Sequence, residues 1–498
     1  MGRGDTALTK STFLRGWRCA KALYLSLYEP EIPTPPDPAS VARMAFGREI
    51  GILARDLFPG GVEARPSHPY DPAAAMSRTR ALISSRVPAV FEATLDSGRG
   101  QRAAVDILAR GRRGWRLIEV KSSTSVKDEH LPDVAFQLHV ARQAGVEIEG
   151  VEILHLNPNY VRRGAIDVSG LFTARSVMAE AEALLPAVAA SAATLRRLLD
   201  EGRRPEVPIG PHCRQPRDCD CMHYCWAEVP AESVLEIAHL TWEKKFHLYD
   251  QGMRRIQDVP DDCDLPKLSR RHVEALQEGR PIIDAAGLRG FLEDLTFPVR
   301  LLDFETVALA VPLWEGTRPY QQIPFQYSLH ILRALDAEPS HSGFLAEPGP
   351  DPRSALLNSL LPATAGAGSI LAYHMPFELG VMQQLAEAFP DARAEIEQRV
   401  TRMDDLIRPF RAWQFWLPEM GGSFSIKSVA PALAPEMSYE GLEIADGLAA
   451  SLTFGRLISG TEPPEAARLR AALETYCERD TLAMVRVLQA IWRAVEAT

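Results

Sequence analysis

Apolar and polar residues alternate along several short segments in the first part of the chain, and this pattern predicts β-strands. Glycine-containing turns at 98–101 and 111–114 separate three of these segments. Elsewhere in this part the apolar positions recur at helical spacing. The elements predicted here are a helix at 41–58, strands at 88–95, 102–109 and 115–121, a helix at 133–144, a strand at 149–156, and an Ala- and Leu-rich helix at 175–201.

The second part of the chain begins with a polar stretch at 229–290, which Pro260 and Pro266 interrupt. Its pattern predicts a connecting module of helices. Apolar, strand-like segments follow and predict another sheet. The elements predicted after the module are strands at 299–304, 326–332 and 369–373 and a long closing helix at about 464–496.

The order of strands and helices predicts an α/β protein with more than one domain. A chain of 498 residues is long enough for two or three separate cores. We therefore predict α/β domains at 1–228 and 291–498, joined by the helical module at 229–290.

The chain is acidic, with 65 Asp and Glu against 55 Lys and Arg and a net charge of −10. This charge argues against a protein that coats nucleic acid. It does not exclude a nuclease, because carboxylates that hold metal ions add negative charge locally. Arginines, which suit bidentate phosphate contacts, cluster in the predicted strand region. They are Arg99, Arg102, Arg110, Arg112, Arg113, Arg116, Arg162 and Arg163.

The sequence predicts a cytoplasmic protein without a membrane partner. Its N-terminal residues lack an apolar core followed by a small-residue cleavage site, so no signal peptide is expected. No apolar run is expected to reach the roughly 20 residues that span a bilayer.

Two carboxylates and a lysine are predicted on neighbouring strands. Glu119 and Lys121 are two residues apart in LIEVKSS, so strand alternation places both side chains on one face. A hairpin brings Asp106, in AAVDIL, beside them. Carboxylate oxygens suit Mg²⁺ or Mn²⁺, which polarise a phosphate and activate a water molecule. Lys121 is expected to orient that water or to neutralise developing charge.

This set resembles the PD-(D/E)XK nuclease superfamily, which includes restriction endonucleases and RecB-type nucleases. The resemblance rests on Glu119-Val120-Lys121 as the E-x-K strand, with Asp106 before it. It implies that Glu49, in the helical FGREIG, completes the metal site. It also implies that Gln137, in AFQLHV, takes part in catalysis.

Four of the seven cysteines lie within 13 residues, which in a reducing compartment predicts metal binding. Cys213, Cys219 and Cys225 are spaced by six, and Cys221 is additional. The paired C-x-x-C knuckles of a zinc ribbon are missing. Three cysteines need a fourth ligand, and Cys19 is the candidate.

One N-terminal and three C-terminal cysteines around such a domain resemble the iron–sulfur nucleases, including AddB-type proteins. The resemblance implies a [4Fe–4S] cluster on Cys19, Cys213, Cys219 and Cys225, which staples the two ends of the domain. Zinc is the alternative metal. Cys221 could replace Cys219 or Cys225, and the sequence leaves this open. The remaining cysteines, Cys263 and Cys477, are expected to be buried thiols.

A second acidic set lies in the last 200 residues. Asp303 and Glu305, in RLLDFET, are two apart on a predicted strand. Glu378 follows a later strand, in MPFELGV. Tyr476 and Asp480 are four apart on the closing helix and share one of its faces.

This set resembles the DEDD exonucleases of the Tyr subclass, which have a ribonuclease-H-like fold and include DnaQ-like proteins. The resemblance implies that Asp303, Glu305, Glu378 and Asp480 hold two divalent ions and that Tyr476 positions or deprotonates the attacking water. Glu378 stands where the family has Asp, which puts the activity of this site in question. Asp404 or Asp405 is expected to be a non-ligand acid, and Lys427, in GGSFSIKSVAPAL, to lie near phosphate.

Over nearly its whole length the chain resembles a bacterial family that fuses a RecB-like iron–sulfur nuclease to a DnaQ-like domain. The resemblance implies a metal-dependent DNA nuclease in repair or defence. It would cut single strands or ends with the first domain and trim 3′ ends with the second. Two alternatives stay open: an RNA-processing nuclease, and a nucleic-acid-binding scaffold with an inactive C-terminal domain.

Overall fold

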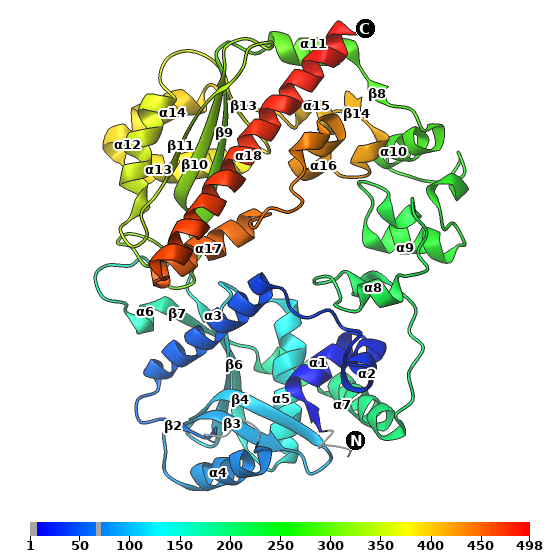
Figure 1. Cartoon of the computed structure of the whole chain (residues 1–498). Coiled ribbons are helices and arrows are strands. Elements are labelled where there is room, and N and C mark those ends of the chain that lie inside the picture. The colour runs from blue at the N-terminus through cyan, green and yellow to red at the C-terminus, as the bar shows by residue number, and fades with distance from the viewer. Residues whose placement is uncertain (1–6, 66–70) are drawn as a thin grey trace. The chain divides into compact units, whose positions relative to one another are not determined.

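A computed structural model describes residues 7–65 and 71–498 (Figure 1). The chain divides into two compact units. Unit 1 comprises residues 1–228 together with 309–320, and unit 2 comprises 229–308 together with 321–498. Both units combine helices with a mixed sheet, so the predicted α/β class is confirmed.

Unit 1 is built on a sheet in the order β2-β3-β4-β5-β6-β7, and β1 adds to β4. The neighbours β3, β4 and β5 are antiparallel, whereas β5 and β6 are parallel. The strands are β1 (Leu8–Thr9), β2 (Val62–Glu63), β3 (Ala89–Asp96), β4 (Gln101–Arg110), β5 (Trp115–Lys121), β6 (Ile148–Leu156) and β7 (Phe172–Ser176). The helices are α1 (Lys10–Arg18), α2 (Ala20–Tyr28), α3 (Pro38–Ala54), α4 (Pro72–Ser84), α5 (Leu131–Gln143), α6 (Val168–Leu171), α7 (Met178–Glu201) and α8 (Met222–Cys225).

Helix α5 joins the sheet of unit 1 to its other helices. Val134 and Phe136 pack with Val105 of β4 and with Leu195 of α7 in one hydrophobic core. The ring of Phe13, on α1, stacks on Phe136 with 4.2 Å between ring centroids. Helix α1 is therefore fixed against α5, the helix that follows β5.

Helix α7 differs from what the sequence led us to expect, because its length and composition would allow it to cross a membrane. Core helices pass the same test, and one face of α7 packs into unit 1. The buried residues of that face are Ala181, Val188, Ala192, Leu195 and Leu199.

Unit 2 contains a sheet in the order β11-β10-β9-β12-β13 and a separate ribbon of β8 and β14. The strands β9, β10 and β11 are antiparallel, whereas β12 is parallel to β9 and to β13. The strands are β8 (Ile282–Ile283), β9 (Val299–Val307), β10 (Ile323–Leu332), β11 (Ser340–Leu345), β12 (Ile370–Ala372), β13 (Met403–Asp405) and β14 (Phe415–Trp416). The helices are α9 (Trp242–Asp250), α10 (Lys267–Glu278), α11 (Ala285–Glu293), α12 (Pro352–Ala363), α13 (Pro376–Ala388), α14 (Arg393–Val400), α15 (Arg408–Arg411), α16 (Ile426–Leu433), α17 (Gly447–Ser459) and α18 (Pro463–Glu496).

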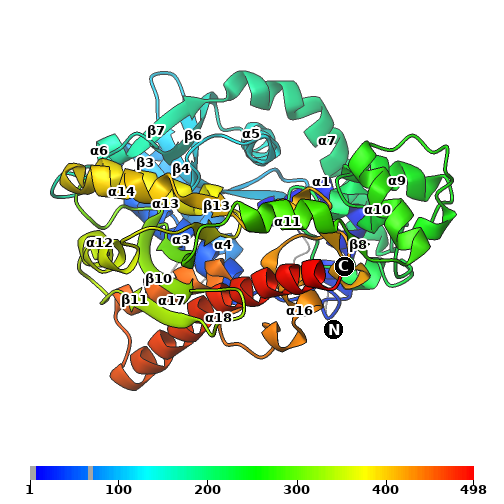
Figure 2. The same cartoon turned by 90° about the horizontal axis from the view of Figure 1, so that it is seen from above.

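Helices cover both faces of the unit 2 sheet (Figure 2). On one face, Leu302 of β9 packs with Leu356 of α12 and Val381 of α13. On the other face, Leu301 packs with Leu488 of α18. The alternation of β9 thus sends successive residues into two different cores.

The predicted strands and the closing helix match the structure closely, whereas the domain division differs in two places. Residues 229–290 belong to unit 2 and do not form a unit of their own. Residues 309–320, between β9 and β10, belong to unit 1. Trp314 and Thr317 of this segment are buried, and the backbone N–H of Arg162 donates to the Thr317 carbonyl at 2.9 Å.

Candidate functional site

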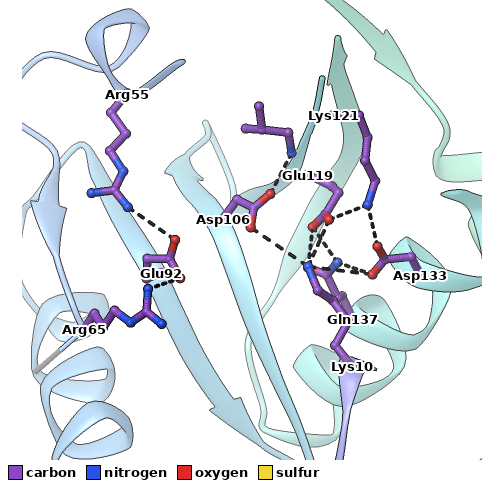
Figure 3. Close-up of polar contacts among 10 residues, drawn as sticks. Lys10, Arg55, Arg65, Glu92, Asp106, Glu119, Lys121, Asp133 and Gln137 are labelled. Atoms are coloured by element: carbon purple, nitrogen blue, oxygen red, sulfur yellow. Dashed lines mark hydrogen bonds and ion pairs between the residues drawn. The ribbon is translucent and has the colours of Figure 1, made fainter. Parts of the chain in front are cut away.

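The acidic residues predicted on β4 and β5 come together with two residues of α5 (Figure 3). The backbone N–H of Val120 donates to Asp106 Oδ2 at 2.8 Å, which joins the two strands beside the site. Gln137 Nε2 donates to Glu119 Oε2 at 2.7 Å and to Asp133 Oδ1 at 2.8 Å. Glu119, Asp133 and Gln137 are all buried, so this polar cluster lies inside the fold.

Two lysines balance this negative charge. Lys121 Nζ lies 2.7 Å from Glu119 Oε1 and 2.7 Å from Asp133 Oδ2. Lys10 Nζ, from the start of α1, lies 2.9 and 3.1 Å from the two carboxylate oxygens of Glu119. The site therefore holds three carboxylates and two ammonium groups.

The carboxylates of this site differ in their tendency to hold a proton. Burial and the charge of Glu119 raise the pKa of Asp106 to about 7. Burial also acts to raise the pKa of Glu119, but Lys10 and Lys121 outweigh it and hold that pKa well below its usual range. A divalent cation beside Asp106 would favour its ionised form, so this donor set fits Mg²⁺ or Mn²⁺.

One residue predicted for this site forms no hydrogen bond or ion pair with its described residues, and two residues of the site were not predicted. Glu49 is exposed on α3, and no hydrogen bond or ion pair links it to the described site residues, so the structure gives no support to its predicted ligand role. Asp133 and Lys10 were not predicted. Asp133 lies four residues before Gln137, and this helical spacing could have revealed it. Lys10 reaches the site only because β1 pairs with β4, which the local sequence does not indicate.

The cysteines predicted as ligands gather where the end of α1 meets residues 210–225. Cys19, Cys213, Cys219 and Cys225 line one small cavity, together with Cys221 and His212. Burial raises the pKa of the Cys225 thiol, and the neighbouring Cys213, Cys219 and Cys19 add to this effect. Two basic residues of α1 hold the loop, since Arg15 pairs with Asp220 and Arg18 Nε donates to the His212 carbonyl at 2.7 Å.

Cys221 shares much of its surroundings with Cys219, whose Sγ lies 3.8 Å from Asp220 Oδ1. The Sγ of Cys221 lies 3.6 Å from Asp220 Oδ1, and its side chain packs against Ala22 and Leu25. Burial raises the pKa of this thiol to about 12, and Asp220 contributes to the shift. Cys219, Cys221 and Cys225 all line the same cavity, so Cys221 stays an alternative ligand to Cys219 or Cys225.

The grouping of the cysteine side chains bears on metal binding. Among groups of three or more His, Cys, Asp or Glu residues in the described part of the chain, one that contains two cysteines has all its ligand atoms within 4.8 Å of one another. That group is Cys219, Asp220 and Cys221. A single zinc ion with Zn–S bonds of about 2.3 Å would need the four sulfurs close together. Four cysteine sulfurs also match the Cys₄ ligand set of a [4Fe–4S] cluster, so both kinds of metal group stay candidates for these thiols.

The predicted acidic residues of unit 2 also converge. Asp303 and Glu305 lie on β9, Glu378 on α13, and Asp480 on α18. Burial raises the pKa of Asp303 well above its usual range, and the charges of Asp480, Glu305 and Glu378 add to this effect. Glu378 Oε2 is buried and has no hydrogen-bond partner. A buried carboxylate oxygen without a donor is the feature expected of a cation site.

Two tyrosines and a lysine border these carboxylates. Tyr439 donates its hydroxyl to Asp480 Oδ1 at 2.5 Å, and Tyr476 also forms a hydrogen bond with Asp480. Lys427 Nζ lies 5.6 Å from the ring centroids of both tyrosines. Tyr439 was not predicted, because it belongs to an irregular segment without a motif.

The other predictions for unit 2 have mixed outcomes. Asp405 is buried and accepts the backbone N–H groups of His374 at 2.8 Å and Ile407 at 3.2 Å, so it braces the turn before α13. Asp404 pairs with Arg408. Cys477 is buried as predicted, but its Sγ lies 3.8 Å from Asp303 Oδ2, at the acidic site. Cys263, expected to be buried, is half-buried.

The raised pKa values in unit 2 predict that the metal-free protein loses stability as pH rises. Burial and Asp480 raise the pKa of Glu305 to about 8, and burial raises that of Glu378 to about 8, from ordinary values of 4.5. Between pH 4.5 and about pH 8, the folded state keeps protons on these two carboxyl groups that the unfolded chain has released. A higher pH therefore favours unfolding. We expect the melting temperature to fall by on the order of 5 °C between pH 5 and pH 8.5.

The control for this prediction is the double variant Glu305→Gln, Glu378→Gln, measured by thermal unfolding in the same buffers. It should lose most of the pH dependence, and Mn²⁺ should oppose the decline in the wild type. An equal decline in the variant would contradict the assignment to these two groups.

Comparison with known proteins gives two matches. Residues 300–425 match a family described as "Domain of unknown function (DUF2779)". These residues include Asp303, Glu305 and Glu378 but not Asp480. A protein of Mycoplasma pneumoniae, "Uncharacterized protein MG366 homolog", is 24% identical over 203 residues, which are 37% of this chain and 31% of that protein.

Proposed function

We propose that this chain is a metal-dependent nuclease with one hydrolytic site in each unit. The observation that carries the proposal is the convergence of Asp303, Glu305, Glu378 and Asp480, which are distant in sequence, into one cluster. Burying like charges together is costly, so such clusters are typical of sites that bind cations or take part in catalysis. The arrangement of Asp106, Glu119, Lys121 and Gln137 gives unit 1 a second site of related chemistry.

The finer fold assignment is part of the same proposal. Unit 1 is proposed to be a restriction-endonuclease-like PD-(D/E)XK domain, and unit 2 a ribonuclease-H-like domain of the DEDD type. Support comes from the E-x-K pair on β5 followed by Gln137 on α5. For unit 2 it comes from the D-x-E pair on β9, with Tyr476 and Asp480 on α18.

The chemistry proposed for unit 1 divides among its residues. Asp106 and Glu119 would hold a divalent ion, which polarises the phosphate and lowers the pKa of a bound water. Lys121 is held between Glu119 and Asp133 and can neutralise charge that develops on the phosphate. Gln137 fixes the Glu119 carboxylate by its hydrogen bond.

In unit 2 the four carboxylates would hold two divalent ions, which stabilise the attacking and leaving oxygens. Tyr476 and Tyr439 both donate to Asp480 and so orient this carboxylate toward the other acids. Tyr476 is also the group proposed to position the attacking water. The buried, unpartnered Glu378 Oε2 supports a ligand role for this residue in spite of its longer side chain.

A nucleic-acid partner is supported by a basic groove in unit 1. An open pocket beside the cysteine site is lined by Lys21, Arg197, Arg203 and Arg204 and by the half-exposed ring of Tyr224. Glu201 and Glu206 also line this pocket, so four basic side chains stand against two acidic ones in a chain whose net charge is −10. Basic groups can contact phosphates, and an exposed ring can stack on a base.

For the cofactor, Cys19, Cys213, Cys219 and Cys225 would hold a [4Fe–4S] cluster with a structural role. Such a cluster would tie α1 to the residues after α7. Zinc on the same thiols is the alternative, and the metal content of the purified protein decides between them.

The proposal is tested by cleavage of 5′- and 3′-labelled single-stranded DNA and RNA with Mn²⁺. Lys121→Ala should lower the unit 1 activity by about 10²–10³-fold, because a charge beside the phosphate is lost. The matched control is Lys127→Ala, an exposed lysine after the same strand, which should cleave like the wild type.

The substrate that is cut identifies the class of nuclease. Cleavage of RNA alone would make the protein an RNA-processing enzyme. Intact DNA and RNA under all conditions would refute the enzyme proposal and favour the binding scaffold.

A further inference from the structure

The ammonium group of Lys10 lies among three carboxylates of the unit 1 site. Its Nζ is 2.9 and 3.1 Å from the two oxygens of Glu119. It is also 3.9 Å from Asp106 Oδ1 and 3.9 Å from Asp133 Oδ1. Lys121, in contrast, forms ion pairs with Glu119 and Asp133 and none with Asp106. Among the described residues, Lys10 is therefore the lysine shared by Asp106 and Glu119.

The backbone of Lys10 is held in place on both sides. Leu8 is fully buried, and β1 pairs with β4 at Leu8↔Gln101. Thr9 caps α1, since its side chain accepts the backbone N–H of Thr12. Four residues later, Phe13 is fully buried against Phe136 of α5. The position of Lys10 is thus fixed by packing, whereas its long side chain is still about a quarter exposed, at 26%.

A divalent ion and the Lys10 ammonium group compete for the same place. Mg²⁺ binds carboxylate oxygens at about 2.0–2.1 Å. An ion shared by Asp106 and Glu119 would therefore occupy the space in which Lys10 Nζ now contacts both acids. Lys121 can stay during such an exchange, because Asp133 holds it on the other side of Glu119.

We propose that Lys10 is a displaceable counter-ion of this site: its ammonium group balances Asp106 and Glu119 until a divalent cation replaces it, and it returns when the cation leaves. The inference rests on the proposed metal-dependent function. It follows that Lys10 weakens metal binding and swings toward solvent when the metal is bound. The site can thus stay folded and charge-balanced at low metal concentration.

The test measures Mn²⁺ binding by calorimetry in a background in which Asp303→Asn and Glu305→Gln weaken the unit 2 site. Lys10→Gln should bind Mn²⁺ about tenfold more tightly than the background protein, because a charge-assisted hydrogen bond no longer has to be broken. Lys10→Arg, which keeps the charge, and Lys127→Gln, an exposed lysine, should show no tightening.

A second measurement needs no variant. Acetylation of Lys10, followed by mass spectrometry, should become several-fold faster when Mn²⁺ is added to the wild type, with Lys127 as the internal reference. Equal or weaker Mn²⁺ affinity in Lys10→Gln, or an unchanged acetylation rate, overturns the inference and leaves the nuclease proposal intact. If the background protein binds no Mn²⁺, both the inference about Lys10 and the proposed metal-dependent function of unit 1 are overturned.

Discussion

Asp303→Asn is expected to abolish the activity of unit 2 and, at the same time, to raise the stability of the metal-free protein. Asp303 is the acid whose pKa burial and the three neighbouring carboxylates raise well above its usual range. Loss of a carboxylate proposed to hold both ions should lower the proposed 3′-end trimming on the order of a thousandfold. The amide keeps the shape of the side chain, so packing is preserved.

The stability gain should depend on pH in a defined direction. The ordinary pKa of Asp is 3.8, so the unfolded chain releases this proton at low pH while the folded protein retains it. The stability of the wild type therefore falls as pH rises, and Asn has no proton to lose. At pH 8 we expect a melting temperature higher by on the order of 3 °C, the shift that about 1 kcal/mol produces in a unit of this size.

Thermal unfolding with and without Mn²⁺ checks this second effect. The advantage of Asp303→Asn should shrink at pH 5 and disappear in Mn²⁺, which stabilises only the wild-type carboxylates. Lower stability of the variant at every pH would mean that Asp303 serves the fold and not a metal site. An exposed control, Asp336→Asn, should change neither activity nor stability.

Cys19→Ser is the second substitution with a large expected effect, because it acts on iron content and stability together. Cys19 ends α1 and is the only predicted ligand from the start of the chain. Its loss would open the proposed metal staple, which closes nearly 200 residues, so we expect the melting temperature of unit 1 to fall by more than about 10 °C. The brown absorbance and the bound iron should disappear in the same preparation.

Two matched variants make the cysteine experiment specific. Cys221→Ser should keep the proposed cluster if Cys19, Cys213, Cys219 and Cys225 are its ligands. Cys263→Ser, in unit 2, should also keep it. A colourless wild type with stoichiometric zinc would instead contradict the iron–sulfur assignment. Loss of metal in Cys221→Ser would mean that Cys221 is a ligand in place of Cys219 or Cys225.

The parts of both sites that sequence reasoning predicted depend on local periodicity. Glu119 and Lys121 share a strand face because they are two residues apart, and Tyr476 and Asp480 share a helix face because they are four apart. The residues that escaped prediction depend on long-range packing. Lys10 needs the parallel pairing of β1 with β4, which links residues more than 90 positions apart. Tyr439 reaches Asp480 from a segment without periodicity.

The two units differ from the predicted domain division because long-range packing also decides where a loop belongs. Residues 309–320 follow directly on the strand that carries Asp303, so proximity in sequence assigned them to unit 2. They belong to unit 1 because Trp314 is buried there and because the hydroxyl of Tyr320 donates to the Ser122 carbonyl at 2.6 Å. A loop between two strands of one sheet can pack in another unit when its backbone hydrogen-bond partners lie there. The local sequence pattern does not predict this.

Helix α1 has one predicted functional group at each end, and this sets an order for the maturation of the protein. Nine residues, or about 14 Å of helix, separate the start of α1 at Lys10 from its end before Cys19. During synthesis, Cys213 leaves the ribosome almost 200 residues after Cys19. The strands that carry Asp106 and Glu119 therefore emerge before the cysteines that anchor the far end of α1. On the proposed assignments, we expect a nascent chain to cleave no substrate until its cluster has been inserted.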